Sequence, residues 1–376
     1  MPTIYSTEHE VFRHSLRRFL DKELVKPYER FNTKDGVDQF WRKAGDAGLL
    51  GSCFAPEYGG AGGDFVFNVI IGEEVGRSVG SAYVGSVIMS DLTSHILNRF
   101  GTDEQKALYA PGMISGEIHA AMPLTEPSGG SDVAAIKTVA IREGDEYVIN
   151  GSKAFISNGA YAKLLFLAAK TDPAKGASGI SLILVPADTP GVVQQKMALI
   201  GWPMGDTGQL FFTDVRVPAS NLLGQERKGM EMLMSILMQD RLQVGSRCQG
   251  AVELALDLTL DYVKHRKAFG QRVLDFQNTQ FVLAEIRTDI EAGRAFLDQC
   301  MMKLQEGTLT MAGATMLKLW MSEMEGRVMD KCLQLFGGAG LLEDMPISRM
   351  YTAARVQRIY SGTSEMQKVG IARSLS

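Results

Sequence analysis

The sequence predicts a mainly α-helical protein with a central β domain. Its 376 residues are enough for two or three structural units with sizeable cores. Helical periodicity runs from Thr7 to about Glu117, short apolar runs separated by turn residues follow, and long helical patterns return after Pro218. We therefore expect an N-terminal helical domain over 1–117, a middle β domain over 118–220 and a C-terminal helical domain over 221–376.

Helices are expected throughout the first region. Its first helix shows large apolar residues at helical spacing, with arginines between them: Phe12, Leu16, Phe19 and Leu20. The segments 91–100 and 102–114 have the same amphipathic character. Breaks between helices are expected at Pro27, Gly36, Gly48 and the glycine-rich loop 56–63.

The middle region changes to a strand pattern. Its runs are short, apolar and rich in β-branched or aromatic residues, and they cover 147–149, 163–169, 179–185, 191–193 and 209–217. Turn residues such as Asn150-Gly151 and Gly205-Asp206 separate them. This spacing favours several short, mostly antiparallel strands.

The last region returns to helices. Four apolar residues lie on one face of a long helix: Leu283, Ile286, Ile290 and Leu297. A glycine-rich stretch, Gly337-Gly338-Ala339-Gly340, interrupts the helical pattern.

Composition limits the function. The net charge of −4, from 39 basic and 43 acidic residues, does not favour nucleic acid or an anionic membrane surface. The four cysteines form no Cys-x-x-Cys pair, which favours a reducing cytosol over a disulfide framework or a zinc site. On this cysteine usage we expect a cytoplasmic protein. No stretch of about 18 apolar residues is present, so we expect no membrane span.

Common nucleotide and metal motifs do not match. The chain has neither G-x-G-x-x-G nor G-x-x-x-x-G-K-[ST]. His9-Glu10 and His14 approach H-E-x-x-H, but the second histidine is one residue too far to share a helix face with the first. We therefore expect no metal site.

Two segments of the middle region have residues suited to a flat polar ligand. In Leu124 to Asp132, two glycines let the backbone approach a ligand closely, and the hydroxyls nearby suit a polar ring edge or phosphate oxygens. In Asn150 to Gly159, the aromatic Phe155 precedes the hydroxyl of Ser157 by two residues. The alternatives are a plain Gly-Ser turn for the first and an ordinary hairpin for the second.

Three further segments lie in the C-terminal region. The first is Arg266-Lys267-Ala268-Phe269-Gly270-Gln271 with Phe276-Gln277, which could equally be a solvated basic patch at a helix end. The second is Gln334 to Gly340, followed by Asp344 and Arg349. The third is the tail Tyr360-Ser361-Gly362-Thr363-Ser364-Glu365.

These five segments, in this order and across about 350 residues, resemble the acyl-CoA dehydrogenase family. The resemblance implies a helical N-terminal domain, a middle β-barrel or sandwich domain and a C-terminal four-helix bundle. It also implies FAD as cofactor, an acyl-CoA substrate, an electron-transfer flavoprotein as acceptor, and a homo-oligomer, usually a tetramer, with a dimer as the alternative.

The resemblance also assigns site residues. Those expected to bind FAD are Met122, Leu124, Thr125, Gly130, Ser131, Phe155, Ser157, Arg266, Phe269, Gln277, Gln334, Gly337, Gly338, Thr363 and Glu365. Arg266 is expected to reach the FAD pyrophosphate of a neighbouring subunit, a task that suits a bidentate guanidinium. Residues expected to contact the substrate are Ser131, Arg241, Ser361 and Gly362.

Ser361 stands where many members of the family carry the catalytic glutamate. Removal of an α-proton from a thioester needs a base, and serine cannot act as one without a base of its own. Members similar to the isovaleryl- and long-chain enzymes supply the glutamate from another helix, just before an arginine. The corresponding residues here are Asp240 and Arg241.

The local pattern supports Asp240 as the base. Leu233, Leu237, Asp240 and Val244 share one helical face, so the carboxylate lies on an apolar stripe where burial should raise its pKa. The alternative is an Asp-Arg surface pair at a frayed helix end. Aspartate is one methylene shorter than glutamate, and a displacement of about 1 Å can cost on the order of a hundredfold in rate.

The expected reaction is α,β-desaturation of an acyl-CoA to the 2,3-enoyl-CoA, with Asp240 taking the proton and flavin N5 taking hydride. The Ser361 backbone N–H, together with a flavin ribityl hydroxyl, could polarise the thioester carbonyl. Three alternatives remain open: a flavin oxidase of the same fold, a dehydrogenase acting on carrier-protein thioesters, and a non-catalytic acyl-CoA-binding flavoprotein.

Overall fold

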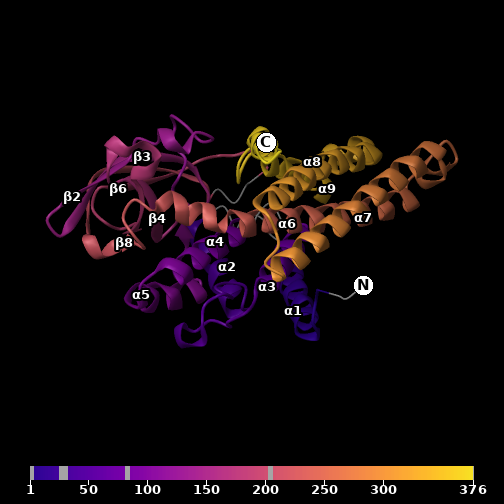
Figure 1. Cartoon of the computed structure of the whole chain (residues 1–376). Helices are drawn as coiled ribbons and strands as arrows, with labels where there is room; N and C mark the ends of the chain where they lie inside the picture. Colours follow the sequence, from indigo (N-terminus) through magenta and orange to yellow (C-terminus); the bar gives the residue numbers. More distant parts are fainter. Residues whose placement is uncertain (1–3, 25–32, 81–84, 202–205, 376) are drawn as a thin grey trace.

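The structure is a computed structural model that describes residues 4–24, 33–80, 85–201 and 206–375. Helices come first: α1 (Thr7–Leu24), α2 (Lys34–Asp46), α3 (Phe65–Gly76), α4 (Gly85–Phe100) and α5 (Asp103–Ile114). Strands follow, and then α6 (Gly229–His265), α7 (Gln277–Gln305), α8 (Met311–Phe336), α9 (Pro346–Ala354) and α10 (Ser364–Arg373). The predicted order of helices, strands and helices is confirmed (Figure 1).

The structure tests one of the two helix breaks that the sequence predicted at Pro27 and Gly36. The break expected at Gly36 is wrong, because α2 begins at Lys34 and includes Gly36 in its first turn. The cause is the cap: the Thr33 hydroxyl accepts a hydrogen bond from the Gly36 amide at 3.2 Å, which starts the helix before the glycine. The break expected at Pro27 lies outside the described residues.

The middle of the chain forms one eight-stranded sheet, apart from short 3₁₀ turns. The strands are β1 (Ala120–Ala121), β2 (Val139–Glu143), β3 (Glu146–Ile156), β4 (Leu164–Lys170), β5 (Ile180–Pro186), β6 (Val192–Lys196), β7 (Gly208–Pro218) and β8 (Leu222–Leu223). Their order is β6-β7-β3-β2-β4-β5-β8, with β1 paired to β4. The pairs β1–β4 and β2–β4 are parallel and the rest are antiparallel, as the turn spacing predicted.

Strands β4 and β5 are buried on both faces, which explains their uninterrupted apolar sequence. Phe166 and Leu182 face a core shared with α4, α5 and the start of α6, whereas Leu167 and Ile183 face the interior of the β domain. The sheet is thereby fixed against the N-terminal half of α6.

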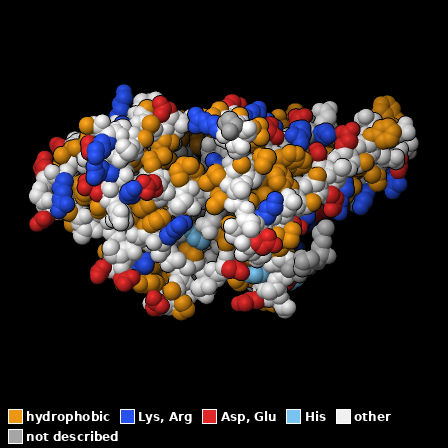
Figure 2. Space-filling model, in the orientation of Figure 1, with side chains coloured by type: hydrophobic (Ala, Val, Ile, Leu, Met, Phe, Trp, Pro, Cys, Tyr) orange, Lys and Arg blue, Asp and Glu red, His pale blue; other side chains and the backbone are white. Residues whose placement is uncertain are grey.

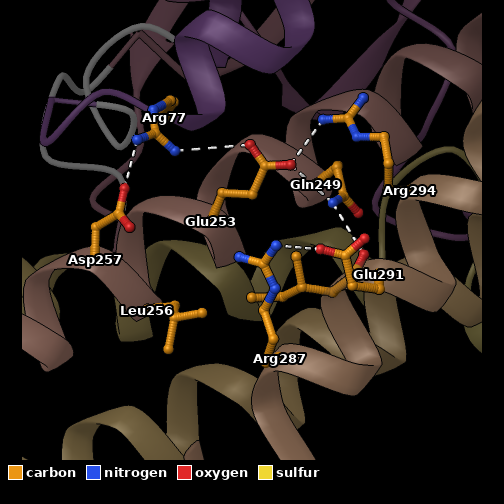
Figure 3. A pocket seen from close by; sticks show the side chains of 9 residues that line it. Arg77, Gln249, Glu253, Leu256, Asp257, Arg287, Glu291 and Arg294 are labelled. Atoms are coloured by element: carbon orange, nitrogen blue, oxygen red, sulfur yellow. Dashed lines mark hydrogen bonds and ion pairs between the residues drawn. The ribbon is translucent and has the colours of Figure 1, made fainter. Parts of the chain in front are cut away.

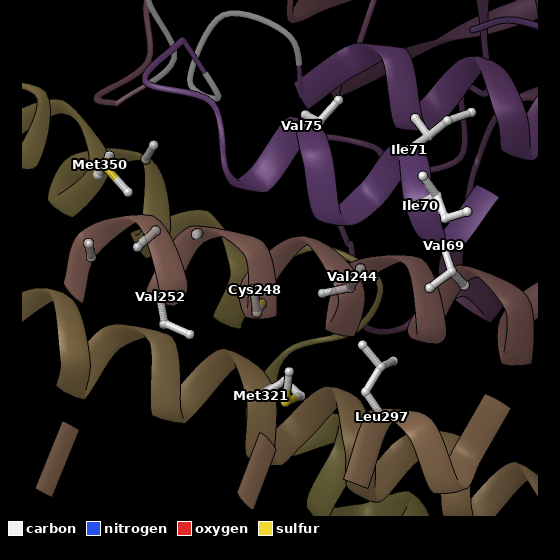
Figure 4. Close-up of a cluster of buried hydrophobic side chains, with 14 of the residues drawn as sticks. Val69, Ile70, Ile71, Val75, Val244, Cys248, Val252, Leu297, Met321 and Met350 are labelled. Atoms are coloured by element: carbon white, nitrogen blue, oxygen red, sulfur yellow. The ribbon is translucent and has the colours of Figure 1, made fainter. Parts of the chain in front are cut away.

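Helix α6 connects the parts of the molecule. With 37 residues it is about 56 Å long. Its first turns pack on the sheet through Met232, Leu233 and Ile236, and its later turns enter the core of the helical bundle. Figure 4 shows Val244, Cys248 and Val252 of α6 between α3 on one side and Met321 of α8 on the other. Asp240 therefore lies where the two cores meet.

Glycines let α3 approach α6 closely. A Cβ at Gly76 would lie 2.1 Å from the carbonyl oxygen of Arg247, and one at Gly250 would lie 1.9 Å from that of Glu73. Neither distance can be tolerated, so only glycine allows the two backbones to cross at this separation.

A buried ionic network joins α1 and α3 to the bundle beside this crossing. Glu73, only 3% exposed, accepts hydrogen bonds from Arg13 at 2.6 Å and from Arg294. Arg294 also donates to Glu253 at 2.8 Å, and Arg77 pairs with Asp257 (Figure 3). Arg77, Glu253, Asp257 and Arg294 border a cavity of about 260 Å³ between α6 and α7. Buried charges are tolerated here because each has a partner.

No helix in the described residues is long and apolar enough to cross a membrane.

Candidate active site

Asp240 is a buried acid on α6. The residue is 5% exposed, and the helix continues to His265, so the alternative of a surface pair at a frayed helix end is wrong. Burial raises the pKa of Asp240 above its ordinary value, while a hydrogen bond from the Ser361 side chain and the charges of Arg241 and Lys318 partly oppose that rise. The carboxylate predicted from the apolar stripe is thus desolvated and faces residue 361.

The Ser361–Gly362 turn lies opposite Asp240. Both residues have positive φ, 56° for Ser361 and 86° for Gly362. That conformation is strained for serine, and the surrounding contacts hold it. Gln367 of α10 donates through Nε2 to the carbonyl oxygens of Ser361 and Gly362, each at 2.9 Å. The ammonium group of Lys318 on α8 donates to the Gly362 carbonyl at 2.8 Å.

The amide N–H groups of Ser361 and Gly362 donate to no acceptor in the part of the chain that the structure describes. Since the carbonyls of Ser361 and Gly362 both accept hydrogen bonds, these two amides are the backbone groups of the turn that remain available. Backbone amides without a protein acceptor, next to a buried acid, are suited to binding a carbonyl oxygen of a ligand.

Arg241 is held beside Asp240 by α8. Its Nη1 donates to the Thr315 hydroxyl at 2.7 Å and contacts the Met311 sulfur at 2.8 Å, and its side chain is half-buried. The Nε atom is buried and has no hydrogen-bond partner among the described residues. Arg241 therefore keeps a donor available near the carboxylate.

The two middle-domain segments lie side by side. The Ala154 amide of β3 donates to the Thr125 carbonyl at 3.0 Å, and Lys153 Nζ donates to the Leu124 carbonyl at 3.0 Å. Lys153 also donates to Glu126 Oε1 at 2.9 Å, and both side chains are buried. The family resemblance predicted that both segments contact FAD. The Lys153–Glu126 ion pair brings the two segments into contact.

The groups expected around a ligand in this region are accessible. Phe155 is 60% exposed and has a φ of 58°, so β3 turns its aromatic ring outward. Gly130 and Ser131 are exposed, whereas Thr125 and Ser157 are half-buried. Met122 and Leu124, also half-buried, pack on the core between the sheet and the helices.

A second group of predicted residues lies at the far end of the bundle. Arg266 and Phe269 lie at and beyond the end of α6, in the hairpin of β9 (Lys267–Ala268) and β10 (Gln271–Arg272), and Gln277 begins α7. They are separated from Asp240 by the rest of α6, about 39 Å. Tyr262 stacks on Phe336 and donates to its carbonyl at 3.2 Å, so the end of α8, with Gln334, Gly337 and Gly338, lies at this end too.

This far end is open to solvent. Phe269 is 98% exposed with a φ of 50°, and a Cβ at Gly337 or Gly338 would meet nothing within 4 Å. Figure 2 shows hydrophobic side chains at the tip where α6 turns into α7. One copy of the chain does not bring these residues to Phe155 and Thr125.

Thr363 and Glu365 lie at the start of α10. The Thr363 hydroxyl accepts from the Met366 amide at 3.3 Å and caps the helix, and Glu365 is exposed in the first turn. They adjoin the Ser361–Gly362 turn along the chain.

Comparisons with known proteins decide the family. Three family models cover the chain: acyl-CoA dehydrogenase N-terminal domain over residues 6–117, middle domain over 121–215 and C-terminal domain over 227–376. The long-chain specific acyl-CoA dehydrogenase of Rattus norvegicus mitochondria is 39% identical over 376 residues, covering 99% of this chain and 87% of the relative.

The chain belongs to the acyl-CoA dehydrogenase family. The crystal structure of the acyl-CoA dehydrogenase from Geobacillus kaustophilus matches with a TM-score of 0.95 and 42% identity over 100% of both chains. A glutaryl-CoA dehydrogenase from Mycobacterium smegmatis, solved in complex with FADH2, matches with a TM-score of 0.90 and 26% identity over 99% of this chain and 95% of that one. The predicted fold class is confirmed, and the chain is a member of an oxidoreductase family.

Membership in the acyl-CoA dehydrogenase family implies FAD, and the residues present fit this cofactor. Phe155 follows Ala154, whose amide donates to the Thr125 carbonyl, and its exposed aromatic ring suits a flat heterocycle. Glycines with open space around them, such as Gly337 and Gly338, leave room for a backbone approach to phosphate oxygens. The guanidinium of Arg266 is exposed and suits a pyrophosphate.

Sequence reasoning missed three side chains that shape the site: Lys318, Gln367 and Lys153. Lys318 is a single cation in the apolar run Met316-Leu317-Lys318-Leu319-Trp320-Met321, a pattern that could have marked it as a buried polar group. Gln367 and Lys153 gave no comparable signal, because glutamine and lysine near turns are ordinarily exposed.

Proposed function

We propose that this protein is an FAD-dependent acyl-CoA dehydrogenase that converts an acyl-CoA to its 2,3-enoyl-CoA, with Asp240 as the base. The observation that carries the proposal is a buried carboxylate facing a turn whose backbone amides have no acceptor among the described residues. Membership in an oxidoreductase family supports the reaction class, and the burial of Asp240 beside the turn supports its role as base.

Asp240 is suited to take the α-proton. An aspartate in water is too weak a base for carbon acids, but burial raises the pKa of Asp240 and makes it a stronger base when ionised. The nearby charges of Arg241 and Lys318 favour the ionised carboxylate and so oppose part of the rise in the pKa of Asp240. Removal of the α-proton leaves Asp240 protonated and develops enolate character in the thioester, with negative charge on its carbonyl oxygen.

The Ser361–Gly362 turn is suited to hold that oxygen. Its two amides donate to no acceptor within the described ranges, and its carbonyls are fixed by Gln367 and Lys318. The turn therefore needs no rearrangement to receive negative charge. The Ser361 hydroxyl engages Asp240 rather than replacing it as base. This arrangement gives a role to a serine that cannot remove the proton itself.

FAD, when bound, supplies the acceptor for the hydride that leaves the β-carbon. Its flavin end would contact Met122, Leu124, Thr125, Gly130, Ser131, Phe155 and Ser157, with Thr363 and Glu365 close to the substrate turn. Ser131 would also contact the substrate, as would Arg241. Electrons would then pass to an electron-transfer flavoprotein.

A complete FAD site would need a second copy of the chain. Arg266, Phe269, Gln277, Gln334, Gly337 and Gly338 lie at the opposite end of the bundle from Asp240. In a homo-oligomer, a tetramer or a dimer, they could serve the FAD bound to a neighbouring copy. The 98% exposure of Phe269 favours such an intersubunit role over a function within one copy.

An anaerobic titration tests the proposed function. Purified protein loaded with FAD is mixed with straight-chain, branched and aromatic acyl-CoAs while the flavin absorbance is followed. At least one acyl-CoA should bleach the flavin and yield the enoyl-CoA. A flavin that no acyl-CoA reduces would contradict the proposal, and peroxide released during aerobic turnover would mark an oxidase instead.

A further inference from the structure

We propose that Lys318 is a positioning residue for this site: its ammonium group fixes the Ser361–Gly362 turn opposite Asp240. The inference rests on the proposed function, because it assigns Lys318 a role in arranging the base and the carbonyl-binding amides. Lys318 itself contacts neither of these amides, and it acts through the groups that it holds.

The burial of Lys318 demands an explanation. It is 0% exposed, and its helix neighbours Leu317 and Met321 lie in the bundle core. Transfer of an ammonium group into such a place is costly unless it is paired. Burial lowers the pKa of Lys318 to about 8, because a site without water disfavours the charged form. A methionine or leucine would fill the same space without this penalty.

The direct partner of Lys318 is the carbonyl of Gly362. Nζ lies 2.8 Å from that oxygen, which also accepts from Gln367. Gln367 alone bridges both carbonyls of the turn, so Lys318 adds an anchor from a different helix. Because α8 and α10 hold the carbonyl side of the turn, its amides remain available for a ligand.

Lys318 also acts electrostatically on the base. The titratable and charged groups that face Lys318 or Asp240 are Arg241 and Cys248 of α6, Glu323 of α8 and Tyr360 of the C-terminal segment. Lys318 and Arg241 are the two cations in this group of residues. Both charges lower the pKa of Asp240 against the effect of burial, so one residue orients the turn and adjusts the base.

The test compares variants by anaerobic stopped-flow reduction of the flavin across pH. Lys318→Met removes the charge and the donor, so the limiting rate should fall at least about tenfold and the pH midpoint of the rate should move upward. Lys318→Gln keeps a donor, so the same upward movement should come with a smaller loss of rate. Gln367→Met disturbs the turn without changing a charge, so its rate should fall with no upward movement.

The matched control is Lys331→Met. Lys331 is on the same helix and pairs at the surface with Glu285 at 2.8 Å, so its loss should leave both rate and midpoint unchanged. FAD content and circular dichroism identify folded variants. If Lys318→Met does not fold, Lys318→Gln carries the test. Failure of both to fold would overturn the inference, because it would assign Lys318 to the core rather than to the site.

Other results are equally decisive. Wild-type rate and midpoint in both Lys318 variants would overturn the inference, as would a loss of rate without movement of the midpoint. A failure of the proposed function looks different: the wild-type flavin would not be reduced by acyl-CoA, or Asp240→Asn would still allow reduction.

Discussion

Nζ of Lys153 and Oε1 of Glu126 form a 2.9 Å ion pair that is buried inside the proposed cofactor region. Glu126 also accepts from the Lys137 amide at 2.6 Å and the Thr138 amide at 2.9 Å, and Lys153 reaches the Leu124 carbonyl. Burial by itself would raise the pKa of Glu126, but these hydrogen bonds outweigh that effect. The pKa of Glu126 is therefore lower than its ordinary value. The pair ties β3 to the 124–132 segment.

We therefore expect Lys153→Met to release FAD. The substitution leaves the Glu126 carboxylate buried with one partner fewer, at a cost of about 3–5 kcal/mol, and frees the two segments from each other. Retention of FAD after gel filtration and its Kd are the measurements. Adding Glu126→Gln should recover part of the loss, since no unpaired charge then remains. Lys163→Met, at an exposed lysine just before β4 in the same domain, should bind FAD normally.

Glu325 should make stability fall as pH rises. Burial raises the pKa of Glu325 to about 7 in the folded protein, although a hydrogen bond from Cys248 and the charges of Arg247 and Arg358 oppose the rise. Between its ordinary value of 4.5 and about 7 the folded state holds a proton that the unfolded state has lost. The stability that this proton contributes is fully present below pH 4.5 and is lost as the pH rises from 4.5 to about 7.

The measurement is the thermal midpoint of wild type and Glu325→Gln at pH 5, 6, 7 and 8. Glutamine cannot ionise, so the variant should gain stability relative to wild type as pH rises, by up to about 3 kcal/mol. Equal pH dependence in the two proteins would mean that Glu325 is not protonated in the folded state.

Arg294→Met should destabilise the protein strongly. It leaves the buried Glu73 with one of its two arginines, and removing one partner of a buried pair costs about 3–5 kcal/mol. Arg287→Met is the control, because Arg287 and Glu291 are an exposed pair on the same helix (Figure 3) and such pairs contribute about 0–1 kcal/mol. Similar thermal midpoints for the two variants would contradict the role of the network in joining α1 and α3 to the bundle.

Complementation tests the intersubunit FAD site. Arg266→Ala and Phe155→Ala should each lose FAD when expressed alone. Co-expressed, they should recover part of it, because a mixed oligomer can pair the intact Arg266 of one copy with the intact Phe155 of another. No recovery in purified mixed oligomers would show that each copy binds FAD with its own residues.

Much of the fold follows from local sequence patterns. One face of α7 is buried as its spacing predicts, and it carries Leu283, Ile286, Ile290 and Leu297. The strand runs expected in the middle region correspond to β3–β7. These predictions succeed because burial follows helical and strand periodicity. The helix start before Gly36 was missed because a single capping hydroxyl outweighed the glycine.

The site was predictable where it depends on one helix and otherwise was not. The apolar stripe around Asp240 lies within α6, so its burial could be read from neighbours in sequence. The contact between Lys318 and Gly362 joins α8 to a turn 44 residues later, and no local pattern encodes it. Likewise, the joining of Lys153 to Glu126 depends on how β3 meets a loop 27 residues before it.

The most direct test of Asp240 as base is anaerobic flavin reduction by a competent acyl-CoA in wild type, Asp240→Asn and Asp240→Glu. We expect the asparagine variant to bind FAD and acyl-CoA but to reduce its flavin at least about a thousandfold more slowly, a loss within the range attributed to general bases. The glutamate variant, which keeps a carboxylate, should remain active. Flavin bleaching at the wild-type rate in Asp240→Asn would contradict the assignment.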